Sequence, residues 1–280
     1  MSRLLALLFA LSLTLPVHAT LAAIVPARDG LVIAADSRLT FMGAACDGAF
    51  KILIPGRPAR TVVIVTGASV FVPPPPASPH NPCRYLATAP RLLDIGAVVT
   101  RTLQQQSDSE NIDIAALTRA CIRALAQFQS RYPAVLRTYA GRDIFSVVIA
   151  GYDRARATTT LRNFAVRLDA HTRKIEIGRD SESVLTPQNP RGIWIYGETE
   201  WLNRTVYAGP GRRLLTAATL RFLGARAPIA GTTRAQALAA ARNILAAAIR
   251  TARSNPPPSG IGGAVHAVFI GVSPHPQPTR

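Results

Sequence analysis

Residues 20–40 read TLAAIVPARDGLVIAADSRLT, and the pattern of this stretch decides the expected fold. Two apolar runs, residues 21–25 and 31–35, flank the segment PARDG. The Asp29-Gly30 pair favours a tight turn, so the stretch predicts a β-hairpin that starts directly after Thr20. Because nearly every residue of both runs is apolar, we expect this hairpin to lie in a sheet that is covered on both faces.

The residues before the hairpin predict a secretory signal peptide, residues 1–19. An apolar stretch at 4–15 is followed by Pro16, and Val17 and Ala19 occupy the minus-three and minus-one positions of a cleavage site. The stretch of about 12 residues is too short to span a bilayer, which takes about 20. No cysteine follows the cleavage site, which argues against a lipid anchor. We therefore expect a periplasmic or secreted protein that has no membrane attachment once the signal is removed.

Composition predicts one domain at residues 20–272, followed by a flexible tail at 273–280. A hydrophobic fraction of 48% is enough for a sizeable core. The net charge of +17 arises from basic residues that are scattered singly and hardly interleave with aromatic residues. This pattern favours a generally basic surface and not a nucleic-acid interface.

Three cysteines, Cys46, Cys83 and Cys121, would enter an oxidising compartment, where one disulfide can form and one cysteine is left over. The sequence does not select the pair. No histidine stands in a metal-ligand pair, and no phosphate-binding or dinucleotide-binding glycine motif is present. We therefore expect neither a metal nor another cofactor.

The remainder of the chain alternates blocks of strands and helices, and this order predicts an α+β fold with helices on both sides of sheets. Asp113 is the expected cap of the second helix, and His266, in the last strand, is expected to be a core histidine with satisfied hydrogen bonds. Further strands are predicted at 51–54, 61–66, 144–150, 161–168, 174–177, 193–196 and 262–272, and helices at 92–103, 114–128, 212–223 and 234–252.

Removal of the signal peptide would turn Thr20 into both a nucleophile and a base. A threonine hydroxyl needs a base to remove its proton, and a free α-amine, with a pKa of about 7.7–8.0, is a base on the same residue. An ammonium at Lys51 would lower the pKa of that amine, and a carboxylate at Asp36 would orient the ammonium. The N–H of Gly67 could then stabilise the oxyanion of a tetrahedral intermediate.

Lys51 is informative because arginine is the default cation of this chain. Lysine occurs only at positions 51 and 174 among the 32 basic residues. A lysine at the start of an apolar strand indicates a need for a compact, tunable point charge, which the planar guanidinium of arginine does not supply.

At this point a family resemblance becomes visible. Thr20, Asp36, Arg38 and Thr40 match, without a gap, the N-terminal pattern of mature proteasome β subunits and of the bacterial HslV peptidase, and Lys51 lies one residue short of the usual distance. The segment VTGA around Gly67 and the segment SGIGGAVHAVFI are also similar to segments of that family. The resemblance implies the four-layer αββα sandwich of the N-terminal nucleophile (Ntn) hydrolases.

The resemblance also implies roles for further residues. Arg38 would brace the region of Asp36, and Thr40 would hold the backbone of a substrate. Leu39 and Val65 would line the pocket for the side chain before the scissile bond, which favours apolar substrates.

This chain departs from the family at two places. Gly197 and Glu198 stand where the family has a serine between glycines, and the acidic residue and serines before the late Gly-Gly strand are replaced by RSNPPPSGIGG. Ser254, Asn255 or Ser259 could substitute for them, and the sequence does not choose among the three.

Together these patterns predict an exported threonine-type Ntn hydrolase that cleaves amide bonds, with a peptide or a small amide as its substrate. A non-peptide acylase remains open, as does a non-catalytic exported protein that uses the same fold to bind a partner. Assembly of several copies into a homo-oligomer is compatible with the sequence.

Overall fold

The computed structural model describes residues 20–54, 61–73, 75, 81–106, 112–153, 156, 158–185, 192–224, 231–256 and 260–271. The predicted signal peptide, Ser259 and the predicted tail lie outside the described residues, so these expectations stay predictions.

The predicted N-terminal hairpin is confirmed, and it forms the centre of a four-stranded sheet. Strands β1 (Leu21–Ala27) and β2 (Gly30–Asp36) pair antiparallel around a turn at residues 28–29. Strand β12 (Trp194–Gly197) pairs with β1 and strand β13 (Val265–Gly271) pairs with β2, both antiparallel. All residues of β1 and β2 are buried, as the unbroken apolar runs predict.

A second, five-stranded sheet contains the other predicted hairpin. Ile52 pairs with Ile64 and Leu53 with Val63, which places β5 beside β6 in antiparallel register. The sheet has the order β11-β10-β9-β6-β5. Its strands are β5 (Ile52–Leu53), β6 (Thr61–Gly67), β9 (Asp143–Asp153), β10 (Thr158–Leu168) and β11 (Ile175–Leu185).

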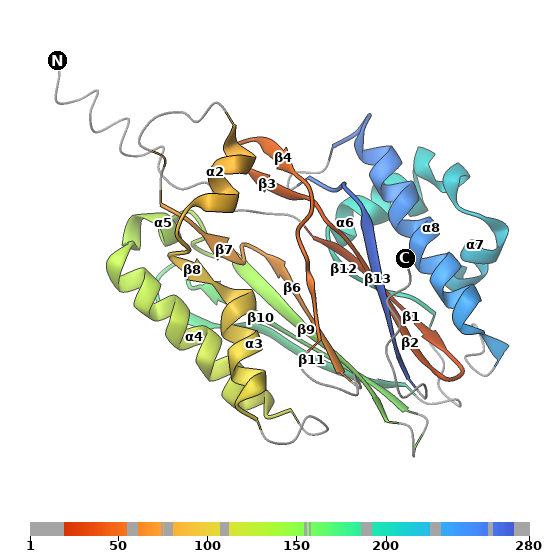
Figure 1. The fold of residues 1–280 in the computed structure, drawn as a ribbon, viewed down its shortest axis with the longest axis horizontal. Helices are drawn as coiled ribbons and strands as arrows, with labels where there is room; N and C mark the ends of the chain where they lie inside the picture. Colours follow the sequence, from red (N-terminus) through yellow and green to blue (C-terminus); the bar gives the residue numbers. More distant parts are fainter. Residues whose placement is uncertain are drawn as a thin grey trace.

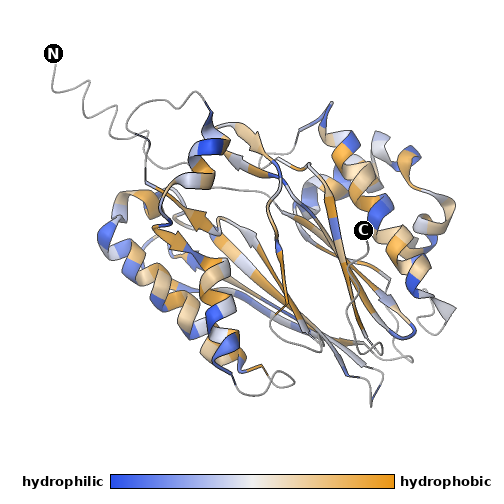
Figure 2. Cartoon of the chain, in the orientation of Figure 1, coloured by the Kyte–Doolittle hydropathy of each residue, from blue (hydrophilic) through white to orange (hydrophobic). Residues whose placement is uncertain are grey.

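Helices cover the outer faces of the two sheets (Figure 1). Helices α3 (Ile95–Gln104) and α4 (Ile114–Arg131) pack on the five-stranded sheet, and α8 (Arg234–Ala252) packs on the four-stranded sheet. A third apolar cluster, which includes Ile24, Ile33 and Ile64, joins the inner faces of the sheets. Figure 2 shows apolar residues concentrated where helices and sheets face one another. A mixed α/β class with antiparallel sheets is confirmed.

Local signals predict the long helices well. The side chain of Asp113 accepts a hydrogen bond from the N–H of Ala116 and caps α4, as expected. Helix α8 spans the predicted residues and starts with a capping box made by Thr233 and Gln236.

The single helix expected at 212–223 is wrong. A 3₁₀ segment (Pro210–Leu214) ends there, and helix α7 (Ala217–Gly224) begins separately. The hydroxyl of Thr216 accepts a hydrogen bond from the N–H of Thr219, while Asn243 of α8 accepts the N–H of Thr216. These tertiary and capping contacts interrupt the helical pattern.

Several short elements were not predicted, because they are too short to show a periodicity and depend on contacts with distant residues. They are β3 (Leu39–Phe41), β4 (Ala44–Cys46), β7 (Val70–Phe71), β8 (Leu93–Asp94), α2 (Pro82–Thr88), α5 (Pro133–Arg137), α6 (Thr199–Leu202) and a π-helical turn (Asn203–Tyr207).

The cysteine pair is decided by the structure. A disulfide joins Cys46 of β4 to Cys83 of α2, and Cys121 is a buried free thiol in α4. A small apolar cluster with Phe41 and Leu86 surrounds the disulfide. The β3–β4 hairpin is thereby fastened to α2. Within the described part of the chain, no helix combines the length and hydropathy that a membrane crossing requires.

Candidate active site

A buried carboxylate at the end of β2 is the centre of the site. Asp36 has no solvent exposure, and four donors surround it. One oxygen, Oδ1, accepts from the N–H of Leu21 and from Nζ of Lys51, both at 2.8 Å. The other, Oδ2, accepts from the N–H of Gly262 at 3.1 Å and from that of Arg38 at 3.4 Å. Such a set of donors compensates the cost of burying an ionised carboxylate.

Lys51 completes a buried ion pair with Asp36. Its side chain is 4% exposed, and Nζ also donates to the carbonyl of Arg38 at 2.6 Å. Burial lowers the pKa of Lys51, while the charge of Asp36 acts in the opposite direction. The amine of Lys51 is therefore easier to deprotonate than an exposed lysine, although a carboxylate lies against it.

Thr20 lies beside this pair, at the entrance to β1. It is 4% exposed, and the next residue, Leu21, donates its N–H to Asp36 and pairs with Gly197 of β12. Gly197 has a φ of +99°, and any side chain there would overlap the carbonyl of Thr20. In the full chain the nitrogen of Thr20 belongs to the peptide bond with Ala19, so a free amine requires cleavage of that bond.

Gly67 ends β6 in a conformation that glycine favours. Its φ is +85°, and a Cβ would overlap the backbone at Ile144. Thr20 directly precedes the residue whose N–H bonds to the buried ammonium–carboxylate pair, and the catalytic roles of Thr20, Asp36 and Lys51 stay predictions. Strand β6 also contacts β12, which pairs with the start of β1. The oxyanion role of Gly67 stays a prediction.

The residues predicted to bind substrate lie on two different strands, β3 and β6. Leu39 and Thr40 are half-buried on β3, where a side chain at Gly260 would overlap the hydroxyl of Thr40. Val65 is buried on β6 in the cluster that joins this sheet to α3 and α4. Both roles in substrate binding stay predictions.

The structure does not bring Ser254 or Asn255 to the carboxylate. Both are exposed and follow α8, where each donates a hydrogen bond to the carbonyl of Thr251, and the carbonyl of Asn255 accepts one from Trp201. The late-chain partner of Asp36 is instead the backbone N–H of Gly262. Sequence reasoning missed this partner because a backbone donor leaves no side-chain signal.

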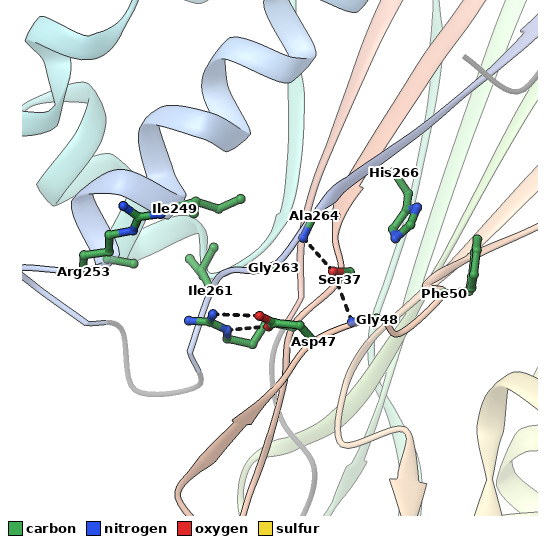
Figure 3. Close-up of a pocket in the computed structure, with 12 residues that line it drawn as sticks. Ser37, Asp47, Gly48, Phe50, Ile249, Arg253, Ile261, Gly263, Ala264 and His266 are labelled. Carbon is green, nitrogen blue, oxygen red and sulfur yellow. Dashed lines mark hydrogen bonds and ion pairs between the residues drawn. The ribbon is translucent and has the colours of Figure 1, made fainter. Parts of the chain in front are cut away.

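Asp47 is a second residue that the sequence did not reveal. It forms a two-point ion pair with Arg38, from Nε to Oδ1 at 2.8 Å and from Nη2 to Oδ2 at 3.1 Å. Hydrogen bonding from Arg38 is the main cause of the lowered pKa of Asp47. This pair borders a cavity of about 590 Å³, which also touches the end of α8 (Figure 3).

His266 lies in this cavity and not in a sealed core. It is half-buried, its ring centroid is 4.7 Å from that of the exposed Phe50, and its Nε2 finds no hydrogen-bond partner within the described ranges. The expected satisfied core histidine is therefore wrong. In Figure 3, His266 and Phe50 stand together at one side of the cavity. Among the described residues, no group of His, Cys, Asp and Glu side chains is placed to hold a metal ion.

The geometry defines a buried ammonium–carboxylate pair behind the first strand of a two-sheet α/β protein. No family model matches the chain, and no curated protein matches it. Similar solved structures include Anbu (ancestral beta-subunit) from Yersinia bercovieri, at 14% identity and TM-score 0.45, with 90% of this chain and 81% of that chain covered. Anbu from Hyphomicrobium sp. strain MC1 is similar at 16% identity and TM-score 0.42, with coverage of 92% and 86%. A mutant of that protein reaches 16% and 0.45, with coverage of 90% and 82%.

These similar structures correct one expectation. They belong to Anbu, a family distinct from proteasome β subunits and HslV, so the predicted membership in the latter group is wrong. At such low identities and TM-scores, the similarity assigns no role to any residue of this chain.

Proposed function

We propose that this chain is an exported threonine-type Ntn hydrolase that cleaves amide bonds, with short or unfolded peptides as substrates and no metal or other cofactor. Its layers of helices and sheets would form a four-layer αββα sandwich. The observation that carries the proposal is the buried Lys51–Asp36 pair, which is bonded through Asp36 to the residue directly after Thr20.

The mechanism follows from these positions. Once the bond before Thr20 is cut, its amine would take the proton of its own hydroxyl, and the oxygen would attack the amide carbon. Lys51 would hold the pKa of the amine low enough for it to be neutral near pH 7, and Asp36 would fix Lys51. Gly67 would donate its N–H to the oxyanion. The proton would then pass to the leaving amine, and water would release the acyl group.

Export is part of the proposal because it creates the catalyst. Signal peptidase would cut after Ala19 and expose the amine of Thr20 without self-cleavage. The Cys46–Cys83 disulfide supports an oxidising location such as the periplasm or the exterior.

Two measurements test the proposal. The N-terminal sequence and intact mass of the exported protein should show a chain that begins at Thr20. Thr20→Ala should abolish hydrolysis of apolar peptide amides and leave the thermal midpoint unchanged. A chain that begins elsewhere, or a mature wild-type protein that hydrolyses no peptide amide, would overturn the proposal and favour the non-catalytic binding protein. Equal hydrolysis by Thr20→Ala would overturn the role of Thr20 as the nucleophile.

A further inference from the structure

The carboxylate of Asp36 depends on a loop that is remote in sequence. The N–H of Gly262, 226 residues away, bonds to Oδ2 of Asp36, and the carbonyl of the same residue accepts the N–H of Arg38 at 3.1 Å. The carbonyl of Arg38 in turn accepts a hydrogen bond from Nζ of Lys51. The backbone of Arg38 therefore connects the late loop, the carboxylate and the ammonium.

The side chain of Arg38 lies flat against this loop. A methyl group at Gly262 would overlap the guanidinium, and one at Gly263 would overlap the hydroxyl of Ser37 and approach Asp47. The hydroxyl of Ser37 accepts the N–H of Ala264 at 2.9 Å (Figure 3). The two glycines thus fill the space between β2 and the Arg38–Asp47 pair.

Among the described residues, Asp47 is the only ion-pair partner of the Arg38 guanidinium. Both carboxylate oxygens of Asp47 accept a hydrogen bond from this guanidinium. A two-point contact fixes the plane of a guanidinium, which a single contact does not. The guanidinium of Arg38 packs against Gly262. By orienting this guanidinium, Asp47 therefore also restrains the Gly262 N–H, which donates its hydrogen bond to Asp36.

We propose that Asp47 is a positioning residue for the catalytic centre: by holding the Arg38 guanidinium over Gly262, it keeps the Gly262 N–H on the Asp36 carboxylate. This inference rests on the proposed function, in which Asp36 orients Lys51 beside the amine of Thr20. Asp47 lies outside the reacting groups and holds the Gly262 loop through Arg38. Burial lowers the pKa of Lys51, and the charge of Asp47 also acts directly on Lys51 to raise this pKa.

A matched pair of variants tests the inference in the mature protein. Asp47→Asn removes the carboxylate that pairs with Arg38 at the site. Asp180→Asn removes a carboxylate that pairs with Arg162 elsewhere on the protein. Side-chain exposures are 31% and 48% for Arg38 and Asp47, and 33% and 42% for Arg162 and Asp180. Similar exposure makes the second variant a control for the loss of one carboxylate beside a surface arginine; Arg162 keeps Glu182 as a partner.

Asp47→Asn should lower kcat about 10- to 100-fold, because a small misplacement of a catalytic group has effects of this size. KM should stay within about twofold, since Asp47 is not expected to touch the substrate and the Cys46–Cys83 disulfide still holds the β3–β4 hairpin. Water entering beside Lys51 should weaken its effect on the amine, so the acid limb of the kcat/KM profile should move to higher pH. Asp180→Asn should change none of these, and Asp47→Glu should restore part of kcat. Equal behaviour of Asp47→Asn and Asp180→Asn would overturn the inference.

A steric variant keeps the inference testable if Asp47→Asn does not fold. Gly262→Ala should push the guanidinium away and reproduce the loss of kcat, whereas Gly231→Ala, which meets no atom within 4 Å, should not. Wild-type kcat in Gly262→Ala would contradict a role for this contact.

Amine labelling separates the inference from the proposed function. The pKa of the Thr20 amine, measured from the rate of its acetylation by acetic anhydride at different pH values, does not depend on hydrolysis. If hydrolysis is absent but Asp47→Asn raises this pKa, the proposed function fails and the positioning role stands. If hydrolysis is present and neither kcat nor this pKa moves, the positioning role alone fails.

Discussion

The two lateral ends of the five-stranded sheet, at its edge strands β5 and β11, both carry ion pairs, but only the end at β5 buries its pair. Beside the end of β6, Lys51 and Asp36 are 2.8 Å apart, with side chains 4% and 0% exposed. At the other end, Arg162 of β10 pairs with Asp180 of β11 at 3.0 Å and with Glu182 of β11 at 3.5 Å, in contact with solvent. A buried pair persists only where further hydrogen bonds compensate its desolvation, while an exposed pair contributes about 0–1 kcal/mol.

The comparison also shows that the larger cavity does not lie at the end with the buried charges. The far end has a cavity of about 720 Å³, larger than the one of about 590 Å³ that borders Arg38 and Asp47. Yet the perturbed, desolvated amine is Lys51, at the other end. A shielded charge with specific partners is the stronger sign of a chemical site.

The largest expected effect comes from breaking the buried pair. Lys51→Met leaves the Asp36 carboxylate without its cation, so the free energy of unfolding should fall by about 3–5 kcal/mol. Hydrolysis should fall by about 10²- to 10⁴-fold, the range expected when a catalytic base is mistuned. Urea unfolding and turnover measure the two effects. The double variant Lys51→Met/Asp36→Asn should regain stability and stay inactive; a double variant as unstable as the single one would show that the lost pair is not the cause.

The next effect concerns the disulfide that holds the β3–β4 hairpin at the same end. Cys46 and Cys83 are 37 residues apart, and a loop of this size predicts a stabilisation of about 4 kcal/mol by the chain-entropy model. Cys46→Ser/Cys83→Ser should therefore unfold at lower urea, and KM should rise because Leu39 and Thr40 lie on β3. A reductant should lower the wild-type midpoint and leave that of the double variant unchanged. Equal sensitivity of both proteins would contradict the assignment.

A smaller effect is expected from pH. Burial lowers the pKa of Lys51 below its ordinary 10.5, so between the folded pKa and 10.5 the unfolded chain binds more protons at this residue than the folded chain. The free energy of unfolding of the wild type, minus that of Lys51→Met/Asp36→Asn, should therefore rise with pH across this window and be flat below it. A difference that falls instead would mean that the attraction of Asp36 outweighs desolvation.

The smallest effect is expected at the far end. Asp180→Asn should change the free energy of unfolding by less than about 1 kcal/mol, because solvent already screens its pair with Arg162. High salt should reduce this change further. A loss comparable to that of Lys51→Met would remove the contrast between the two ends.

Much of the framework was predictable from short-range patterns. The hairpin of β1 and β2, the pairing of β5 with β6, the cap at Asp113 and the extent of α8 all follow from apolar periodicity, turn residues and caps. These signals act over a few residues, so one sequence displays them. Asp36 and Lys51 were also identifiable, from the chemistry that an N-terminal threonine needs, the rarity of lysine in this chain and the family resemblance.

Other features were decided only when distant segments met. The β3–β4 turn places Met42 and Gly43 at positive φ, and its register depends on contacts with α2. The choice of Cys83 as the partner of Cys46, and the open position of His266, likewise depend on where helices and strands pack.

By itself, the sequence determined most of the long strands and helices and the charged residues beside them, because hydrophobic periodicity and the cost of desolvation act on each segment separately. Only the tertiary structure decided what satisfies those charges. The donor to Asp36 from the late loop is a backbone N–H of Gly262, and Asp47 reaches that loop through Arg38. Every residue except proline carries such an N–H, so only the packing of the chain can select the one that reaches the carboxylate.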